Sequence, residues 1–473
     1  MRGMTRQAKR PAVSRRQFLA GALAAFGGRA FSVTTGGKGI PALKFGLLSD
    51  VHVRNPSSGD REVLERALAY FRDRGADAVV IAGDLTDEGL VGQAELVAQA
   101  WYGVFPGDRA PDGRKVEKVF IIGNHDHDAT TRRLKRLLAA QGKGDPFYEK
   151  GVAMAEDFAG CWETLFHEPW ARQYEKEVRG FKFFASHWAE KGEMEDVAAF
   201  LAPRLSGYGE GKPFFHVQHP HPNGTVWGPY AQGRWMGRNA FDALVRHPNA
   251  ISFSGHSHAS LTDERTLWQG AFTAVGTATL RRVSVSGAEE NALGEDADGR
   301  MMPGMVNAPL GRQGQFVEVY DDRIVLERRE FVWMEPLGPD RIVPWPPERK
   351  PFAPDALRSA TPAPEFADGA AVEVSAPFDG KTRGGTPVRQ IKVAFPPARN
   401  GGRVRSYDIA AEGGEAPDVV KTYLQEDLFL TPRRWPKRNV FLFPAEAVAK
   451  GRTLRVYPKN CFGLRGKPIE GNA

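Results

Sequence analysis

Five apolar runs of this chain each end on residues of the types that bind metal ions. They are LKFGLLSDVH (43–52), AVVIAGDLTD (78–87), VFIIGNHD (119–126), FFHVQH (214–219) and AISFSGHSH (250–258). Such runs are typical of strands that are buried on both faces. In open α/β sheets, ligands bind beyond the carboxyl ends of the strands. The five runs therefore predict that Asp, Asn and His side chains gather at one edge of a buried sheet.

Helical patterns separate the first three runs. Apolar residues recur at helical spacing within 61–74, and Gly75 follows them as a stop signal. A second helix is expected over 93–102, before the third run. This order of strands and helices predicts a mostly parallel sheet with helices on its faces. The expected fold class of this part of the chain is α/β.

Strand patterns dominate the second half of the chain. We expect strands over 270–285 and a hairpin over 315–331, whose turn is Asp321-Asp322. The segment 286–314 between them is long and contains Gly, Met and acidic residues. Loops of this length tend to be functional or disordered. We interpret this one as a mobile loop, and a lid over the substrate is the alternative.

Proline marks a boundary further along the chain. Residues 336–364 are rich in proline and predict a linker or an extended wrap. Residues 371–469 then alternate short strands with turns, which favours a β-sandwich. The sequence over 454–468 resembles the last hairpin of a fibronectin type III module. We therefore expect a separate all-β sandwich at the C-terminal end.

The first 30 residues carry the net positive charge of the chain. They hold seven Arg and Lys residues and no acidic residue, and without those seven the 64 basic residues match the 57 acidic ones in number. A neutral remainder does not support binding to nucleic acid or to an anionic membrane through bulk charge. No nucleic-acid partner is therefore expected.

A short basic and apolar segment predicts export. Ser14-Arg15-Arg16-Gln17-Phe18-Leu19 precedes a small apolar stretch and resembles a twin-arginine signal. The stretch is shorter than the roughly 20 residues of a membrane span, so no stable span is expected after processing. The expected partner is the twin-arginine export machinery of a bacterium, and the expected location is periplasmic or extracellular. The alternative is a disordered basic tail.

The cysteines give no reason to expect a disulfide. Cys161 and Cys461 lie far apart in the chain, in what are expected to be different domains, and neither belongs to a C-x-x-C pair.

The ends of the five runs form a set of blocks with a known counterpart. The blocks are Asp50-x-His52, Gly83-Asp84-x-x-Asp87, Gly123-Asn124-His125-Asp126, His219 and Gly255-His256-x-His258. In this order they resemble the signature of calcineurin-like metallophosphoesterases. The resemblance implies a metallophosphoesterase-type β-sandwich flanked by helices. The expected domains are a signal and leader over 1–38, the metallophosphoesterase domain over 39–335, a Pro-rich linker over 336–368 and the all-β sandwich over 369–473.

The resemblance also implies two divalent metal ions and a phosphate-ester substrate. Two ions about 3.5–4 Å apart share a hydroxide and clamp a phosphoryl group, which calls for a bridging carboxylate, and Asp84 is the natural choice. By correspondence, one ion takes Asp50, His52 and His258, and the other takes Asn124, His219 and His256. Mixed His and Asp ligands suit Fe, Mn, Zn or Ni, with no choice among them.

Two further residues have implied catalytic roles. The resemblance places His125 against the substrate, where it protonates the leaving oxygen or stabilises the transferring phosphoryl group. Asp126 is expected to orient the His125 imidazole and to raise its pKa. The implied reaction is in-line attack on phosphorus by the bridging hydroxide.

Each candidate also has a structural alternative. Taken singly, Asp84 suits a turn, and Asn124 suits a turn in the left-handed region. Asp87 is interpreted as an outer carboxylate. Three histidines compete for the fourth block, namely His216, His219 and His221. We favour His219 because it fits the family block, whereas His216 lies on the opposite face of a regular strand.

Three functions remain in competition. The leading prediction is an exported di-metal hydrolase of phosphodiesters or phosphomonoesters. The run Asp84-Leu85-Thr86-Asp87 lacks the tyrosine ligand of purple acid phosphatases, so no ferric-tyrosinate centre is expected. The second candidate is an exported surface-binding protein with a vestigial metal site, which recognises glycan or protein through the C-terminal sandwich. A nuclease is the third candidate, and the neutral charge beyond residue 30 weakens it.

Overall fold

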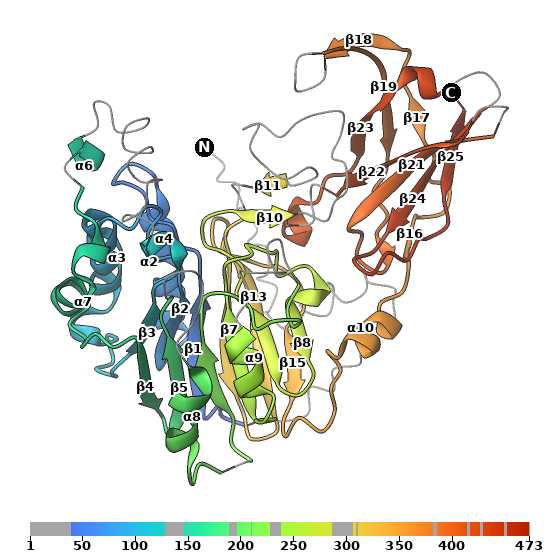
Figure 1. Ribbon diagram of the computed structural model, residues 1–473. Coiled ribbons are helices and arrows are strands. Elements are labelled where there is room, and N and C mark those ends of the chain that lie inside the picture. The colour runs from blue at the N-terminus through green and yellow to red at the C-terminus, as the bar shows by residue number, and fades with distance from the viewer. Residues whose placement is uncertain are drawn as a thin grey trace, which may run out of the picture.

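The computed structural model (Figure 1) covers most of the chain after the expected leader. The described residues are 39–127, 146–149, 151–188, 196–209, 211–227, 238–285, 306–308, 311–381, 386–413, 417–425, 429–448 and 452–472. The expected signal over 1–38 lies outside these ranges, as does most of the expected loop over 286–314. Within the described ranges, no helix has the length and apolar character that crossing a bilayer requires.

The first sheet has seven strands, and three of them come from the first three apolar runs. Its members, in order across the sheet, are β14 (Glu335–Pro336), β13 (Arg323–Glu330), β12 (Gln313–Val319), β1 (Leu43–Leu48), β2 (Ala78–Ala82) and β3 (Glu117–Ile121), and β15 (Arg341–Pro344) also pairs with β13. β1, β2 and β3 are parallel. β12 pairs with β1 in the antiparallel sense. The first sheet is therefore mixed. Within it, the expectation of parallel strands holds for β1, β2 and β3.

The second sheet has six strands and carries the last two apolar runs. Its order is β4 (Gln173–Val178), β5 (Phe181–Ser186), β6 (Phe214–Val217), β7 (Ala250–Ser254), β9 (Thr273–Gly276) and β8 (Leu267–Gln269). β5, β6, β7 and β9 are parallel. A separate two-stranded sheet pairs β10 (Val283–Val285) with β11 (Val306–Ala308).

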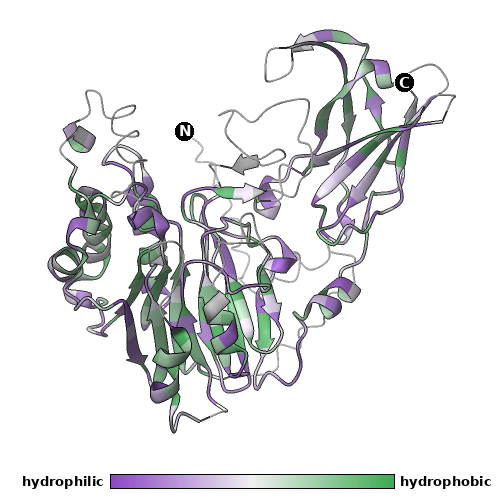
Figure 2. Ribbon diagram, in the orientation of Figure 1, coloured by the Kyte–Doolittle hydropathy of each residue, from purple (hydrophilic) through white to green (hydrophobic). Residues whose placement is uncertain are grey.

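The two sheets pack face to face, because alternate residues of their strands point to opposite sides. The Phe45 ring lies 5.2–5.6 Å, centroid to centroid, from the rings of Phe183, Phe215 and Phe253 in the second sheet. Figure 2 shows apolar residues concentrated along these strands. This aromatic layer holds the two sheets together.

Helices cover the outer faces of the two sheets. The two longest are α2 (Asp60–Asp73) and α3 (Val91–Val104), followed by α7 (Phe158–Phe166), α8 (Val197–Leu205) and α9 (Arg238–Leu244). The domain and its surroundings also contain α4 (Asn124–His127), α6 (Pro146–Glu149) and α10 (Pro354–Ala360). The outward residues of β2, such as Val79 and Ile81, share one apolar cluster with residues of α2 and α3. The predicted β-sandwich flanked by helices is confirmed.

The C-terminal region is all-β, as expected. One of its sheets contains β17 (Glu373–Val374), β18 (Phe378–Lys381), β19 (Pro387–Phe395) and β23 (Asn439–Pro444), and the other contains β22 (Val419–Leu424), β21 (Ser406–Glu412), β24 (Thr453–Lys459) and β25 (Ile469–Asn472), while β16 (Pro364–Glu365) pairs with β20 (Asn400–Gly401). Buried residues from both four-stranded sheets form one core, which includes Val393, Tyr407 and Phe441. The resemblance to fibronectin type III stays a prediction, as do the domain boundaries. Part of the expected linker belongs to the first sheet, because β15 pairs with β13 there.

Polar contacts fasten the C-terminal region to the sandwich. The Arg405 guanidinium lies 3.1 Å from an Asp263 carboxylate oxygen, and both side chains are buried. The Trp227 ring contacts two guanidinium groups, with its centroid 3.8 Å from the guanidinium of Arg265 and 4.4 Å from that of Arg405. The Gln313 side chain donates to the Phe429 carbonyl at 3.0 Å. The two regions are therefore joined by a desolvated contact as well as by the chain.

Substitution of Asp263 tests this contact. Asp263→Ala removes the carboxylate that Arg265 and Arg405 share, so we expect the free energy of unfolding to fall by about 3 kcal/mol. Asp379→Ala is the matched control, since its ion pair with Arg389 is exposed to solvent and contributes at most about 1 kcal/mol. Urea unfolding of both variants measures the difference. Equal midpoints for the two would contradict a buried, stabilising contact.

Candidate metal centre

Several predicted ligands at the strand ends have a left-handed backbone conformation. Among the described residues, ten that are not glycine have a positive φ. Half of these are candidate ligands, namely Asp50, His52, Asp84, His256 and His258, with φ between 47° and 67°. Such conformations cost on the order of 1–3 kcal/mol each and concentrate at functional sites. The turns after β1, β2 and β7 therefore aim these side chains at the expense of local stability.

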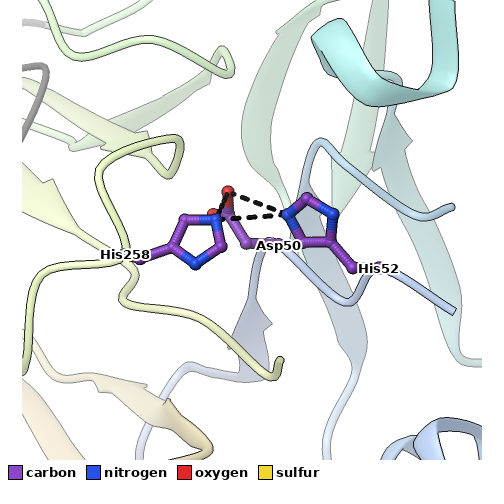
Figure 3. Close-up of side chains that lie close together, drawn as sticks. All are labelled: Asp50, His52 and His258. Carbon is purple, nitrogen blue, oxygen red and sulfur yellow. Dashed lines mark hydrogen bonds and ion pairs between the residues drawn. The ribbon is translucent and has the colours of Figure 1, made fainter. Parts of the chain in front are cut away.

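Three of the predicted residues form a first cluster (Figure 3). Asp50 Oδ1 lies 3.1 Å from His258 Nε2 and 3.8 Å from His52 Nε2. The two Nε2 atoms lie 3.2 Å from each other. The three side chains come from two separate loops and point toward one another.

The other predicted ligands form a second cluster. Asp84 Oδ2 lies 3.1 Å from His219 Nε2. The Asn124 side-chain oxygen lies 3.1 Å from His219 Nε2 and 3.0 Å from His256 Nδ1. His219 is fully buried, whereas His256 and Asn124 are half-buried. All seven candidate ligands therefore lie within these two groups.

Asp84 touches both clusters. Its Oδ2 atom lies 3.5 Å from His52 Nε2 in the first cluster, as well as 3.1 Å from His219 Nε2 in the second. It is the position expected for a carboxylate that bridges two ions.

Outer contacts fix which ring nitrogen each histidine presents. His219 Nδ1 donates to the Ala82 carbonyl at 2.8 Å, and His258 Nδ1 donates to the Arg282 carbonyl at 2.9 Å. His52 Nδ1 lies 2.9 Å from an Asp87 carboxylate oxygen. Partners of this kind are typical of metal-binding histidines, because they leave the Nε2 lone pair free. Donor atoms 3.0–3.5 Å apart also suit a shared ion bound at roughly 2.0–2.2 Å, so the residues fit a metal.

The electrostatics of both clusters favour cations. Although burial alone would lower the pKa of His52, hydrogen bonds to Asp50 and Asp87 raise it to about 10. Burial likewise opposes the charged form of His219, but Asp84 raises its pKa to about 9. Burial opposes ionisation of Asp50 and Asp84, but His258 lowers the pKa of Asp50 and His219 lowers that of Asp84. Two ionised carboxylates inside the protein thus attract positive charge.

Comparison with known protein families identifies the domain that contains both clusters. The calcineurin-like phosphoesterase model matches residues 43–260, which span both clusters. Residues 43–260 form a calcineurin-like phosphoesterase domain. Domains of this family belong to metal-dependent phosphoesterases, which confirms the predicted enzyme class.

Two solved structures similar to this chain have related descriptions. A dimetal phosphatase from Danio rerio is 13% identical, with a TM-score of 0.39, and the match covers 65% of this chain and 100% of that one. A purple acid phosphatase from yellow lupin (Lupinus luteus) seeds is 12% identical, with a TM-score of 0.36, and the match covers 64% of this chain and 54% of that one. No curated protein matches the chain significantly.

The prediction for Asp126 in the phosphoesterase domain is wrong. Its carboxylate accepts from the backbone N–H groups of Leu85, Thr86 and Gly123 at 2.8–3.1 Å and does not contact the His125 ring. The His125 Nδ1–H instead donates to the Asp87 carbonyl at 2.8 Å. Burial lowers the pKa of His125, whereas a rise was expected. Burial raises the pKa of Asp126 to about 6. Asp126 therefore fastens two ligand loops of the domain together.

The remaining histidines of the fourth block are placed away from the clusters. His216 is buried on the other face of β6, near the Ser252 hydroxyl at 3.2 Å. His221 is buried between the hydroxyl groups of Ser254 and Ser257, at 2.6 and 2.8 Å. Burial lowers the pKa of His216 to about 3 and that of His221 to about 4, so both are neutral. Neither takes the place of His219 in the phosphoesterase domain.

Several supporting residues were not predicted. The Ser49 hydroxyl contacts the Asp50 carboxylate, and the Thr279 hydroxyl donates to the Asp50 carbonyl at 3.0 Å. Trp188 packs beside His219 and His256, with ring centroids 6.0 and 5.9 Å away. Only Ser49 carried a signal in the sequence, because it precedes a candidate ligand.

The glycine before Asn124 is a sharp test of this packing. A Cβ atom at Gly123 would lie 2.2 Å from Asp84 Oδ1 and 2.6 Å from the Asp84 backbone nitrogen. We expect Gly123→Ala to displace Asp84, to lower bound metal and to reduce turnover roughly 10²-fold.

Gly103→Ala is the matched control for Gly123→Ala. Gly103 is exposed on α3, and an added Cβ atom meets nothing within 4 Å. Alanine in a helix interior is about 0.5–1 kcal/mol more favourable than glycine. Gly103→Ala is therefore expected to have a slightly higher free energy of unfolding and full turnover. Normal metal content and turnover in Gly123→Ala would show that the Asp84 loop is not packed as described.

Proposed function

We propose that this chain is an exported di-metal phosphoric ester hydrolase that acts on phosphodiesters or phosphomonoesters. The observation that supports it most is the Asp84 carboxylate, which contacts a histidine of each cluster. Asp50, His52 and His258 would hold one divalent ion, and Asn124, His219 and His256 would hold the other. Fe, Mn, Zn and Ni all suit this set of ligands.

The bound ions would supply Lewis-acid stabilisation of the phosphoryl group and a nucleophilic water at neutral pH. Hydrolysis would form a bond from a water oxygen to phosphorus, break the ester P–O bond and deliver a proton to the leaving oxygen. The chain offers His125 for the last step, since its ring lies 4.4 Å from the His52 ring, centroid to centroid.

The backbone around His125 holds it at this place. Its N–H donates to Asp84 Oδ1 at 2.9 Å, and its Nδ1–H donates to the Asp87 carbonyl at 2.8 Å. The Nδ1 contact leaves Nε2 as the other ring nitrogen, which must also carry a proton for His125 to act as the donor to the leaving oxygen. His125 is therefore tied to the same carboxylate that would bridge the ions.

Export rests on the leader alone. The Arg15-Arg16 pair and the short apolar stretch after it support delivery by the twin-arginine route, which carries folded proteins. The proposed location is periplasmic or extracellular.

The test is turnover by the purified full-length protein after loading with Mn, Zn, Ni or Fe(II). Aryl phosphodiesters and aryl phosphomonoesters serve as substrates, and release of the aryl alcohol is the signal. We expect metal-dependent hydrolysis of at least one class, which a chelator abolishes. An absence of hydrolysis with all four metals would overturn the proposed function.

A further inference from the structure

Three arginines converge on one buried carboxylate beside the first cluster. Asp60 is 1% exposed and begins α2. Arg54 donates to it at 2.9 Å, Arg312 lies 3.1 Å from it, and Arg281 lies 4.0 Å from it. These four residues are called the arginine cluster below.

Positive charge exceeds negative charge in the arginine cluster. Three guanidinium groups share one carboxylate, and the N-terminus of α2 adds the partial positive charge of a helix end. The Arg281 Nε atom is buried and has no hydrogen-bond partner among the described residues. Burial lowers the pKa of Arg281, and the charges of Asp60 and Asp87 only partly offset this. A desolvated, partly unpaired guanidinium calls for an anion from outside the chain.

The arginine cluster adjoins the residues proposed to hold the first ion. Arg281 lies between Leu280, whose N–H donates to the Asp50 carbonyl at 3.2 Å, and Arg282, whose carbonyl accepts from His258 at 2.9 Å. Arg54 is two residues after His52. The side chains of Arg54 and Arg281 are 33% and 16% exposed, so solvent reaches both.

We propose that the arginine cluster binds a second phosphate group of the substrate, while the scissile phosphate lies at the metal centre. The inference rests on the proposed function and narrows its substrate class to small molecules with two phosphate groups. Guanidinium groups suit this role, because their planar donors bind phosphate oxygens in pairs. Arg281 is the principal contact, since Arg54 already donates to Asp60.

The experiment compares matched substrates on the metal-loaded, full-length enzyme. The pairs are adenosine 3′,5′-bisphosphate with adenosine 3′-monophosphate, and fructose 1,6-bisphosphate with fructose 6-phosphate, and phosphate release is measured. We expect a higher kcat/KM for the bisphosphate in at least one pair. Arg281→Gln should reduce kcat/KM for that bisphosphate roughly 10–100-fold, mainly through KM, and leave the monophosphate nearly unchanged.

Two variants separate binding from structure. Arg281→Lys keeps the positive charge, so it should retain part of the preference for the bisphosphate that Arg281→Gln loses. Arg72→Gln removes a partly exposed arginine at the other end of α2, away from the arginine cluster, and should keep the preference for the bisphosphate entirely.

The wild-type preference is measured without any variant, so a poorly folded Arg281→Gln leaves the inference falsifiable. Equal kcat/KM within every pair would overturn it, as would equal losses on both members in Arg281→Gln. If aryl esters are hydrolysed without such a preference, only this inference fails. If no phosphoester is hydrolysed, the proposed function fails with it.

Discussion

Asp84→Ala is expected to abolish turnover and to empty much of the metal centre. The Asp84 carboxylate contacts His52 in one cluster and His219 in the other, and it also accepts from the His125 backbone N–H. Its loss removes the carboxylate that contacts histidine side chains of both clusters, and it would leave the charge of two bound ions poorly compensated. We expect turnover to fall more than about 10³-fold, which exceeds the effect of removing a single transition-state contact. Elemental analysis of the purified variant gives the accompanying loss of metal.

Asp77→Asn is the matched control for Asp84→Ala. Asp77 lies immediately before β2, at the opposite end of the strand that Asp84 follows, and accepts from the Lys44 backbone N–H at 2.9 Å. Asparagine keeps an acceptor there, so metal content and turnover should equal those of the wild type. Wild-type activity in Asp84→Ala would contradict a shared carboxylate at the centre.

His125→Ala is expected to separate metal binding from catalysis. The ring does not bond to any candidate ligand side chain in the described part of the chain, so both ions should stay bound. Loss of a proton donor typically costs about 10²–10⁴-fold in rate, and kcat should carry most of that loss. The measurement is kcat and KM for an aryl phosphoester, together with metal content.

His127→Ala serves as the comparison for His125→Ala, since it lies on the same short helix and its ring contacts Phe158 instead. It should keep wild-type kcat. A further test uses substrates with better leaving groups, which need less protonation and should be affected less by His125→Ala. If His125→Ala loses its metal instead, His125 supports the centre and is not the proton donor.

The clusters were predictable because each ligand block is local in the sequence. An apolar run followed directly by Asp or His fixes both a strand and the residue at its end, and parallel strands end at the same edge. Asp50 and Asp84 are found this way, one strand apart. Their positive φ values were not foreseen, since only the neighbouring loops determine them.

The wrong prediction for Asp126 has a simple physical cause. Asp126 and His125 are adjacent in sequence, and this suggested that one orients the other. Both lie in α4, where neighbouring side chains point in different directions around the helix axis. The Asp126 carboxylate therefore faces the loop after β2.

Contacts between distant segments could not be predicted at all. Asp263 and Arg405 are separated by 142 positions, and the placement of β12 beside β1 brings together strands from opposite ends of the first domain. Thr279 reaches the Asp50 carbonyl across 229 positions. Such pairs leave no periodic or local pattern, so only the folded chain reveals them.

The positions of bound metal ions test most directly whether this protein holds a binuclear centre around Asp84. Crystals of the full-length protein are soaked with Mn or Zn, and anomalous difference maps are calculated at the absorption edge of the metal. We predict two peaks about 3.5–4 Å apart, on either side of the Asp84 carboxylate, with Asp50 and His258 at one and Asn124 and His219 at the other. A single peak, or peaks that do not touch Asp84, would contradict a binuclear centre in this protein.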